Sequence, residues 1–267
     1  MAEVELRRRG AVAEIVLDRP ERRNALNAAM WAAIAPLVRE AEADAEIRVL
    51  VLRGAHDTVF AAGADIAELQ AFSHDPEAAR AFGAAVREAQ GSLAACAKPT
   101  IARIAGPCFG GGCGLALACD FRFADETARF AITPARLGLV YALADTKRLV
   151  DVVGPSAAKD ILFTGRILDA EEALRIRLVD RLVPAGGLDD AVASYSELLA
   201  RAAPTTIRGA KDIVAMILSG ASDDTPETTA LFAAALTGPD FREGARAFLE
   251  KRPPDFRGRA DGKKEEH

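Results

Sequence analysis

Cysteine and histidine are scarce in this chain of 267 residues, which contains four cysteines and three histidines. No two cysteines stand in a CxxC pair, and no histidine lies near them in the sequence. The spacing therefore excludes the common zinc motifs and indicates no metal site. We expect reduced, structural thiols of the kind found in cytoplasmic proteins. The cysteines are Cys96, Cys108, Cys113 and Cys119.

Long apolar runs are also missing, because Arg, Asp or Glu interrupts each stretch before it reaches the roughly 20 residues that cross a bilayer. The N-terminal sequence MAEVELRRRG carries charges where a signal peptide needs an apolar core. Basic residues are not in excess, since 34 Lys and Arg oppose 39 Asp and Glu for a formal net charge of −5. Such a chain lacks the cationic footprint of a nucleic-acid-binding domain. We therefore expect a cytoplasmic protein with no membrane and no nucleic-acid partner.

Apolar residues make up half of the chain, which excludes disorder and suits one hydrophobic core. Short β-branched runs alternate with helical periodicity up to about residue 145, and helical periodicity dominates beyond it. This order is typical of an α/β core followed by a helical C-terminal portion. The sequence predicts a hairpin over residues 4–18, strands over 49–54, 99–104 and 121–124, and helices over 28–44 and 75–97.

Two glycine-containing segments are candidates for a ligand site. In Val59–Ile66, Gly63 permits a turn that is closed to other residues, and Asp65 can cap the helix that follows. In Ile104–Asp120, a strand leads through three consecutive glycines into a helix whose first amides have no partner within the helix. Such a helix start attracts anions. The alternative is that these glycines only allow close packing of the helix on a strand.

The order of several motifs resembles the crotonase (enoyl-CoA hydratase/isomerase) superfamily. The motifs span nearly the whole chain and follow the family's order, so the set is specific although each motif alone is weak. They are RPERRNALN at 19–27, FAAGADI at 60–66, the glycine triplet and helix at 106–120, ILFTGRILDAEEA at 161–173 and FLEKRPPDF at 248–256.

This resemblance implies an α/β fold, a crotonase-like spiral of ββα turns with a helical C-terminal region. It implies a spiral core with the CoA-thioester site over residues 1–200 and a helical trimerisation region over 201–256. The tail over 257–267 is charged and contains glycine, so we expect it to be disordered. Members of the family usually assemble as trimers or dimers of trimers. Their substrate is an acyl-CoA thioester, so coenzyme A enters as part of the substrate and no separate cofactor is expected.

The family's shared device is an oxyanion hole of two backbone N–H groups, which bind the thioester carbonyl as it becomes enolate-like. By position, the resemblance assigns these donors to Ala64 and Gly111. One such donor is typically worth about 10²–10³ in rate. The resemblance also implies contacts to coenzyme A from two loops and from a pair on a neighbouring subunit. The matching positions are Arg22, Arg23, Ala25 and Leu26, then Ala62, Asp65 and Ile66, then Phe248 and Lys251.

The chain departs from the family's hydratases at two positions. Those enzymes carry glutamates where this sequence has Gly114 and Pro134. Neither residue can move a proton, whereas hydration needs acid–base groups within hydrogen-bond reach. The family's simple isomerases keep the second glutamate. The segment 133–141 resembles instead the methylmalonyl-CoA decarboxylase branch, which has a tyrosine at the last of these positions but a histidine at the position of Ala64.

Tyr141 and Asp145 are the polar side chains that remain as candidate catalysts. Tyr141, one of two tyrosines, stands in an apolar context and can donate a proton or orient a carboxylate. Asp145 is either a base or the N-cap of a helix over 146–152, and the cap is the favoured alternative. Near the first oxyanion donor, Asp65 is expected to cap a helix and Glu68 to face solvent.

Three functions remain open at this point. The first is an enzyme of the enoyl-CoA hydratase/isomerase family, a lyase or isomerase that stabilises a thioester enolate. The second is an acyl-CoA decarboxylase of the methylmalonyl-CoA type, in which loss of carbon dioxide leaves the enolate without a general base. The third is a catalytically silent acyl-CoA-binding protein, suggested by the two missing glutamates.

Overall fold

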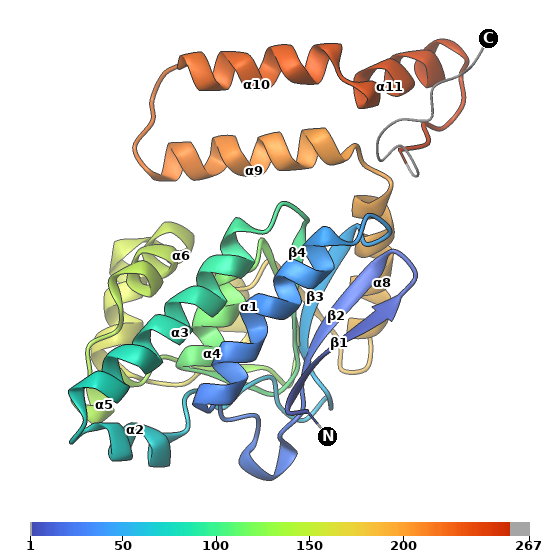
Figure 1. Ribbon diagram of the computed structural model, residues 1–267. Helices are drawn as coiled ribbons and strands as arrows, with labels where there is room; N and C mark the ends of the chain where they lie inside the picture. Colours follow the sequence, from blue (N-terminus) through green and yellow to red (C-terminus); the bar gives the residue numbers. More distant parts are fainter. Residues whose placement is uncertain (1, 257–267) are drawn as a thin grey trace.

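The computed structural model describes residues 2–256, which form an α/β core with a layer of further helices at one end (Figure 1). The predicted hairpin, strands and helices are confirmed, with ends that agree within two residues. Beyond residue 145 the helical prediction is incomplete, because two short strands interrupt the helices there, and one of them joins the main sheet. The predicted disordered tail, 257–267, lies outside the described residues.

The strands form two sheets. The larger has the order β1-β2-β3-β4-β6-β9, with β1 antiparallel to β2 and the other neighbours parallel. The smaller has the order β5-β7-β8. The strands are β1 (Val4–Arg9), β2 (Val12–Leu17), β3 (Val49–Gly54), β4 (Thr100–Ile104), β5 (Pro107–Phe109), β6 (Phe121–Asp125), β7 (Arg129–Ala131), β8 (Leu168–Asp169) and β9 (Arg181–Val183).

Helices cover both faces of the larger sheet, with α1, α3 and α4 on one face and α8 on the other (Figure 1). The helix α9 and the pair α10–α11 make up the terminal layer. The helices are the 3₁₀ turn η1 (Pro20–Arg22), α1 (Ala28–Ala43), α2 (Ile66–Phe72), α3 (Pro76–Ala95), α4 (Gly111–Ala118), α5 (Pro134–Leu137), α6 (Leu143–Thr164), α7 (Ala170–Arg175), α8 (Leu188–Ala200), α9 (Pro204–Leu218), α10 (Pro226–Thr237) and α11 (Pro239–Leu249). No helix in this described part of the chain is both long and apolar enough to span a bilayer.

The central strands are apolar on both faces because each face is covered by helices. In β3, Val49 and Val51 pack with Leu188 and Val192 of α8. Leu50 and Leu52 point to the other face of the sheet and belong to the larger hydrophobic cluster there. This alternation follows from the two-residue period of a strand, and buried parallel strands are therefore apolar throughout. The run VLVLRG was predicted as a buried strand for this reason, and the burial confirms it.

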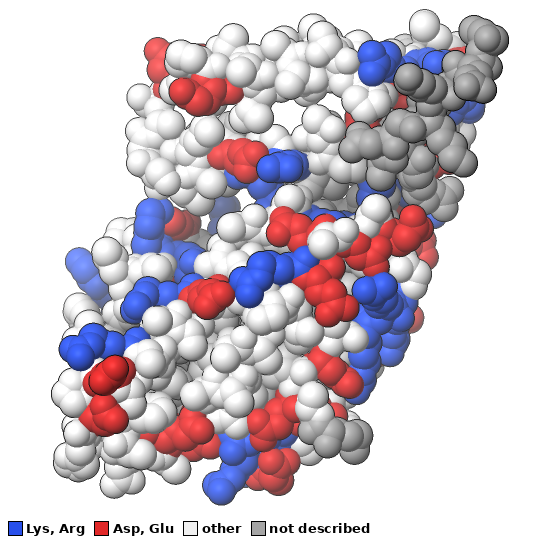
Figure 2. Space-filling view, viewed as in Figure 1, with Lys and Arg blue, Asp and Glu red and all other residues white. Residues whose placement is uncertain are grey.

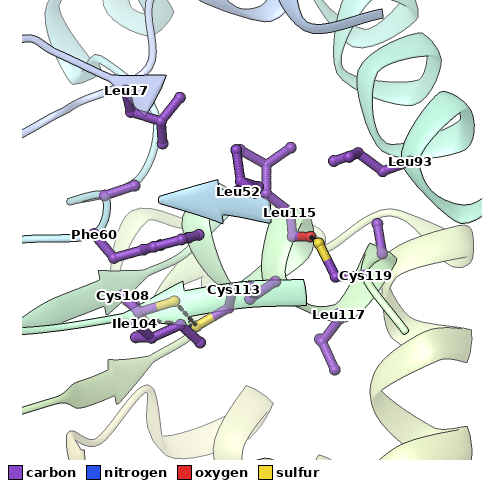
Figure 3. Close-up of a cluster of buried hydrophobic side chains, with 14 of the residues drawn as sticks. Leu17, Leu52, Phe60, Leu93, Ile104, Cys108, Cys113, Leu115, Leu117 and Cys119 are labelled. Atoms are coloured by element: carbon purple, nitrogen blue, oxygen red, sulfur yellow. Dashed lines mark hydrogen bonds between the residues drawn. The ribbon is translucent and has the colours of Figure 1, made fainter. Parts of the chain in front are cut away.

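The core beneath α4 combines aliphatic, aromatic and sulfur-containing side chains from several elements (Figure 3). All four cysteines are buried and unoxidised. The Cys113 thiol donates to the carbonyl of Cys108, and the two sulfur atoms lie 4.0 Å apart. The cysteines therefore act here as small packing residues, as their scarcity and spacing indicated.

Tight corners turn the chain from the larger sheet into the smaller one. Between β4 and β5, Gly106 has φ +63, and a Cβ there would lie 2.2 Å from the carbonyl oxygen of Thr58. Between β6 and β7, Thr127 accepts a hydrogen bond from the Gly106 amide over 3.0 Å, so successive corners stack on each other. Repetition of this strand–corner–strand–helix unit gives the predicted ββα spiral, and the fold class is confirmed.

The corner at Gly106 gives a stability prediction with a matched control at Gly10. Both glycines have positive φ, +63 and +60, but a Cβ on Gly10 would meet nothing within 4 Å. Gly10→Ala should cost about 1 kcal/mol through backbone strain alone. Gly106→Ala should cost about 1–3 kcal/mol more, because the backbone at Thr58 must shift. Urea unfolding of both variants measures the difference, and equal losses would contradict this account of the corner.

Candidate active site

The loop between β3 and α2 pairs with the segment that precedes α1. The amide of Leu26 donates to the carbonyl of Gly63 over 2.7 Å, and the amide of Asp65 donates to the carbonyl of Leu26 over 3.0 Å. Between them, the amide of Ala64 donates to no acceptor within residues 2–256. Gly63 has φ +100, so the predicted need for glycine is confirmed. Asp65 accepts from the amide of Ala67 and is the N-cap of α2, as predicted.

The loop between β5 and α4 turns at Gly110, which has φ +48 and donates its amide to β7 over 2.7 Å. The next amide, that of Gly111, has no acceptor among the described residues. A Cβ on Gly111 would lie 2.7 Å from the Trp31 ring, and a Cβ on Gly112 would lie 2.9 Å from the carbonyl oxygen of Ala61. Close packing thus explains the absence of side chains here, and it leaves the first amide of α4 free.

A short backbone pairing joins these two loops. The amide of Phe109 donates to the carbonyl of Ala61 over 2.8 Å, and Ala61 forms a parallel bridge with Cys108. A Cβ on Gly63 would lie 3.2 Å from the Phe109 carbonyl oxygen, so the two chains are in close contact. Each unpartnered amide follows this pairing by a few residues. The structure therefore brings the two predicted backbone donors to one place, at the start of a helix.

Tyr141 and Asp145 both lie beside this place. The Tyr141 hydroxyl donates to the carbonyl of Gly110 over 3.3 Å, and it lies 3.2 Å from where a Cβ on Gly114 would be. Asp145 is buried in the first turn of α6 and pairs with Arg148 over 3.3 Å. The expectation that Asp145 caps a helix is wrong, because α6 begins two residues earlier and the carboxylate points into the protein, toward Arg148.

Burial controls the protonation of both groups. It raises the pKa of the Tyr141 phenol well above its ordinary value, and the nearby charge of Asp145 raises this pKa further. Tyr141 is only half-buried as a residue, but its hydroxyl points inward, toward the buried Gly114. Burial also raises the pKa of the Asp145 carboxyl, while Arg148 and the Gln90 amide lower it. The phenol is therefore neutral and able to donate.

Gln90 and Arg148 complete the polar cluster, and the sequence did not single them out. Gln90 is buried on α3, and its Nε2 atom lies 2.4 Å from the position of a Cβ on Gly114. Arg148 donates from Nη1 to Gln90 Oε1 over 3.3 Å. The available signal was a glutamine on the apolar stripe of α3, between the buried Ala89 and Leu93. Within residues 2–256 no three His, Cys, Asp or Glu side chains gather as a metal site.

The two loops predicted to contact coenzyme A lie side by side, because the amide of Ala62 donates to the carbonyl of Arg23 over 3.0 Å. The turn between η1 and α1 is fixed by the buried Asn24, whose Nδ2 donates to the carbonyl of Phe60 over 3.1 Å. Of the residues matched to coenzyme A in these loops, Arg22, Arg23 and Ile66 are exposed, Ala25, Ala62 and Asp65 are half-buried, and Leu26 is buried.

Two ionic contacts support these loops and were not predicted. Arg19 donates to the Asp65 carboxylate over 2.8 Å and to the carbonyl of Ala25 over 2.9 Å, and this guanidinium lowers the pKa of Asp65. Glu68 accepts from the amide of Ala28 over 2.7 Å. The expectation that Glu68 only faces solvent is therefore wrong, since it stabilises the start of α1 from a different helix.

Phe248 and Lys251 lie apart from this site in their own chain. Both are exposed at the C-terminal end of α11, with Phe248 83% exposed. Figure 1 shows α11 in the terminal layer and α2 at the opposite end of the molecule. A contribution of this pair to a site therefore requires a second copy of the chain, which is how the family resemblance placed them.

Comparisons with known proteins show the family and the fold of the chain. A sequence profile described as enoyl-CoA hydratase/isomerase matches residues 7–259. An enoyl-CoA hydratase/isomerase family protein from Hyphomonas neptunium superposes with a TM-score of 0.93 at 44% identity, over 96% of this chain and 97% of that one. An enoyl-CoA hydratase/carnithine racemase from Magnetospirillum magneticum gives 0.91 at 38% identity, over 96% of each chain. The crotonyl-CoA hydratase of Syntrophomonas wolfei is 34% identical, over 92% of this chain and 94% of its own.

The raised pKa of Tyr141 gives a direct titration prediction. Tyrosine in an unfolded chain ionises at about pH 10. In the folded protein Tyr141 should stay protonated there, so its burial contributes stability that is lost as the pH rises above that value. Wild type and Tyr141→Phe should therefore show the same tyrosinate absorbance just above pH 10. An absorbance larger in the wild type by about half a tyrosinate or more would show that the Tyr141 phenol is not shielded.

Proposed function

The chain belongs to the enoyl-CoA hydratase/isomerase family of the crotonase superfamily, and from this premise we propose that it is an acyl-CoA thioester enzyme acting on 2-enoyl thioesters. The thioester carbonyl oxygen is held by the amides of Ala64 and Gly111, which act as an oxyanion hole. When water attacks C3 of the acyl chain, the Asp145 carboxylate takes its proton, and the electron pair of the C2–C3 double bond moves toward that oxygen. Both amides stabilise the enolate until Tyr141 gives a proton to C2, and Tyr141 then regains a proton from Asp145.

The observation that carries this proposal is the pair of unpartnered amides. Ala64 and Gly111 are half-buried, and neighbouring hydrogen bonds hold their free N–H groups in place, so both can donate to an acceptor that enters the site. An oxyanion is the ligand that fits, because the Gly111 amide also lies at the positive end of α4. Their positions are set by backbone pairing, so little reorganisation is needed when charge develops.

Proton transfer is assigned first to Tyr141 and second to Asp145. At the two positions where the family's hydratases carry glutamates, this chain has Gly114 and Pro134, and the latter begins α5. The phenol of Tyr141 occupies the region beside Gly114 and is neutral at ordinary pH. A neutral donor beside the oxyanion hole suits protonation of an enolate at C2. Asp145, kept in place by Arg148, is the carboxylate whose charge raises the pKa of that phenol.

Coenzyme A binding is assigned to the paired loops at residues 22–26 and 62–66. The exposed guanidinium groups of Arg22 and Arg23 suit phosphate groups. The backbone of Ala62, Asp65 and Ile66 forms the facing wall, with Ala25 and Leu26 beside it. In this proposal Phe248 and Lys251 reach coenzyme A from a neighbouring subunit.

A trimer, or a dimer of trimers, is the assembly we propose, in the cytoplasm. The terminal layer presents large apolar side chains that a single chain leaves exposed, and Figure 2 shows that this layer is largely uncharged on the face in view. Contiguous apolar surface of this kind marks a protein–protein interface. The exposed residues on α9, α10 and α11 include Val214, Ile217, Phe232, Phe241, Phe248 and Leu249.

Removal of one oxyanion donor tests the function. Ala64→Pro deletes an N–H that has no structural partner, whereas Ala64→Ser keeps it and serves as the control. With crotonyl-CoA, followed by loss of its enone absorbance, the wild type should show saturable turnover. Ala64→Pro should lower kcat by about 10²–10³, and Ala64→Ser should stay within a few fold. Thermal unfolding of both variants checks that the fold is intact.

Other outcomes of this assay identify the remaining alternatives. Carbon dioxide release from malonyl- or methylmalonyl-CoA without turnover of crotonyl-CoA would replace the proposal by a decarboxylase. Binding of CoA esters by calorimetry without turnover of any of them would indicate a silent binding protein. Turnover that is equal in Ala64→Pro and the wild type would contradict the oxyanion hole.

A further inference from the structure

The polar cluster behind Gly114 contains a group that the proposed reaction does not use. Gln90 is 2% exposed, and its buried Nε2 atom forms no hydrogen bond of ordinary length, although the amide lies near enough to the Asp145 carboxyl to lower the pKa of that group. An amide donor left in this condition costs stability, typically about the strength of the missing hydrogen bond. A ligand atom that supplies the missing partner would explain why this group is retained beside the site.

The orientation of the Gln90 amide is fixed by Arg148. A guanidinium can only donate, so its contact with Oε1 at 3.3 Å turns the NH₂ group away from it and toward Gly114. The same Nη1 atom donates to Asp145 over 3.3 Å, which balances the charge of the carboxylate. Gln90 therefore presents an uncharged N–H donor, and the charges of Arg148 and Asp145 next to it cancel each other. This surrounding suits a neutral oxygen atom as acceptor.

The position of the Gln90 amide relative to the oxyanion hole indicates which oxygen atom of a bound acyl group it can reach. Gly114 is three residues beyond Gly111 in α4, which is about 4.5 Å along the helix axis. A thioester oxygen bound at the Gly111 amide places the carbonyl carbon nearby, with C3 two bonds further along the chain. An oxygen on C3 is thus the acyl atom that comes to the region beside Gly114.

Access to this donor involves Tyr141. Its hydroxyl is 3.2 Å from the same Cβ position on Gly114, and its bond to the carbonyl of Gly110 is long, at 3.3 Å. The neighbouring Val140 is 95% exposed, so the segment that carries the tyrosine lies at the surface. A ligand oxygen can take the place of this hydroxyl beside the amide without breaking a strong bond.

We propose that Gln90 is a specificity-determining residue, whose carboxamide donates a hydrogen bond to an oxygen on C3 of the acyl group. The inference rests on the proposed function, because it places the thioester in the site by means of the oxyanion hole. The chemical class that it selects is an acyl-CoA thioester with a neutral C3 oxygen, such as a 3-hydroxyacyl group. Arg148 is the positioning residue that aims the amide.

The test compares two thioesters that differ by this one oxygen. Calorimetry should show that the wild type binds the preferred enantiomer of 3-hydroxybutyryl-CoA about tenfold more tightly than butyryl-CoA. Gln90→Met should bring this ratio close to one while the affinity for butyryl-CoA stays within about twofold. The replacement keeps the shape of the side chain and removes a buried unpaired group, so the fold should tolerate it.

A second variant removes the donor without altering Gln90. In Gly114→Ala the new Cβ would lie 2.4 Å from Nε2, so the amide has to move, and the preference should fall in the same way. Glu88→Met, at an exposed position of the same helix, is the control and should keep the tenfold ratio.

The possible results separate this inference from the proposed function. A preference that persists in both Gln90→Met and Gly114→Ala, or an equal weakening of both thioesters in these variants, overturns the inference and leaves the function standing. A wild type that binds both thioesters equally also overturns it. A wild type that binds neither thioester overturns the inference and the proposed function together.

Discussion

The pairing of the chain near Ala61 with the strand β5 is the interaction on which the site depends. The hydrogen bond from the Phe109 amide to the Ala61 carbonyl, 2.8 Å long, sets one glycine-containing loop against the other. The corner at Gly106 permits it, because only glycine fits against the carbonyl of Thr58. The amides of Ala64 and Gly111 are then left without partners, each in one of the two loops that lie side by side. In this account catalysis uses the two backbone N–H groups that the pairing leaves without an acceptor, so the site needs few side chains.

The glycines around α4 illustrate how packing and chemistry share the same residues. Gly111 accommodates the Trp31 ring, and Gly114 leaves room for a side chain delivered from another helix, Gln90 of α3. A glutamate at position 114 would have to displace that amide. A carboxamide from α3 therefore occupies the space that a side chain at position 114 of α4 would fill. Together with the neutral phenol of Tyr141, this makes the site one of hydrogen-bond donors.

Most of the fold and the backbone part of the candidate site could be predicted from the sequence, because both depend on local signals. The short β-branched run of β3 and the glycines at 63 and 110–112 indicate their structures directly. The side-chain cluster could not be predicted in the same way. Gln90 meets Gly114 only through the packing of α3 on α4, and Asp145, expected as a helix cap, is held instead by Arg148. Glu68 stabilises a helix that begins 40 residues earlier in the chain.

A crystal structure of the protein with a bound, unreactive acyl-CoA thioether or thioester is the most direct measurement of the central claim. The account predicts that the acyl carbonyl oxygen lies within about 2.7–3.1 Å of both the Ala64 and the Gly111 amide nitrogen atoms. It also predicts that coenzyme A follows the paired loops at 22–26 and 62–66. A carbonyl oxygen bound to side chains elsewhere, with both amides still without a partner, would contradict it.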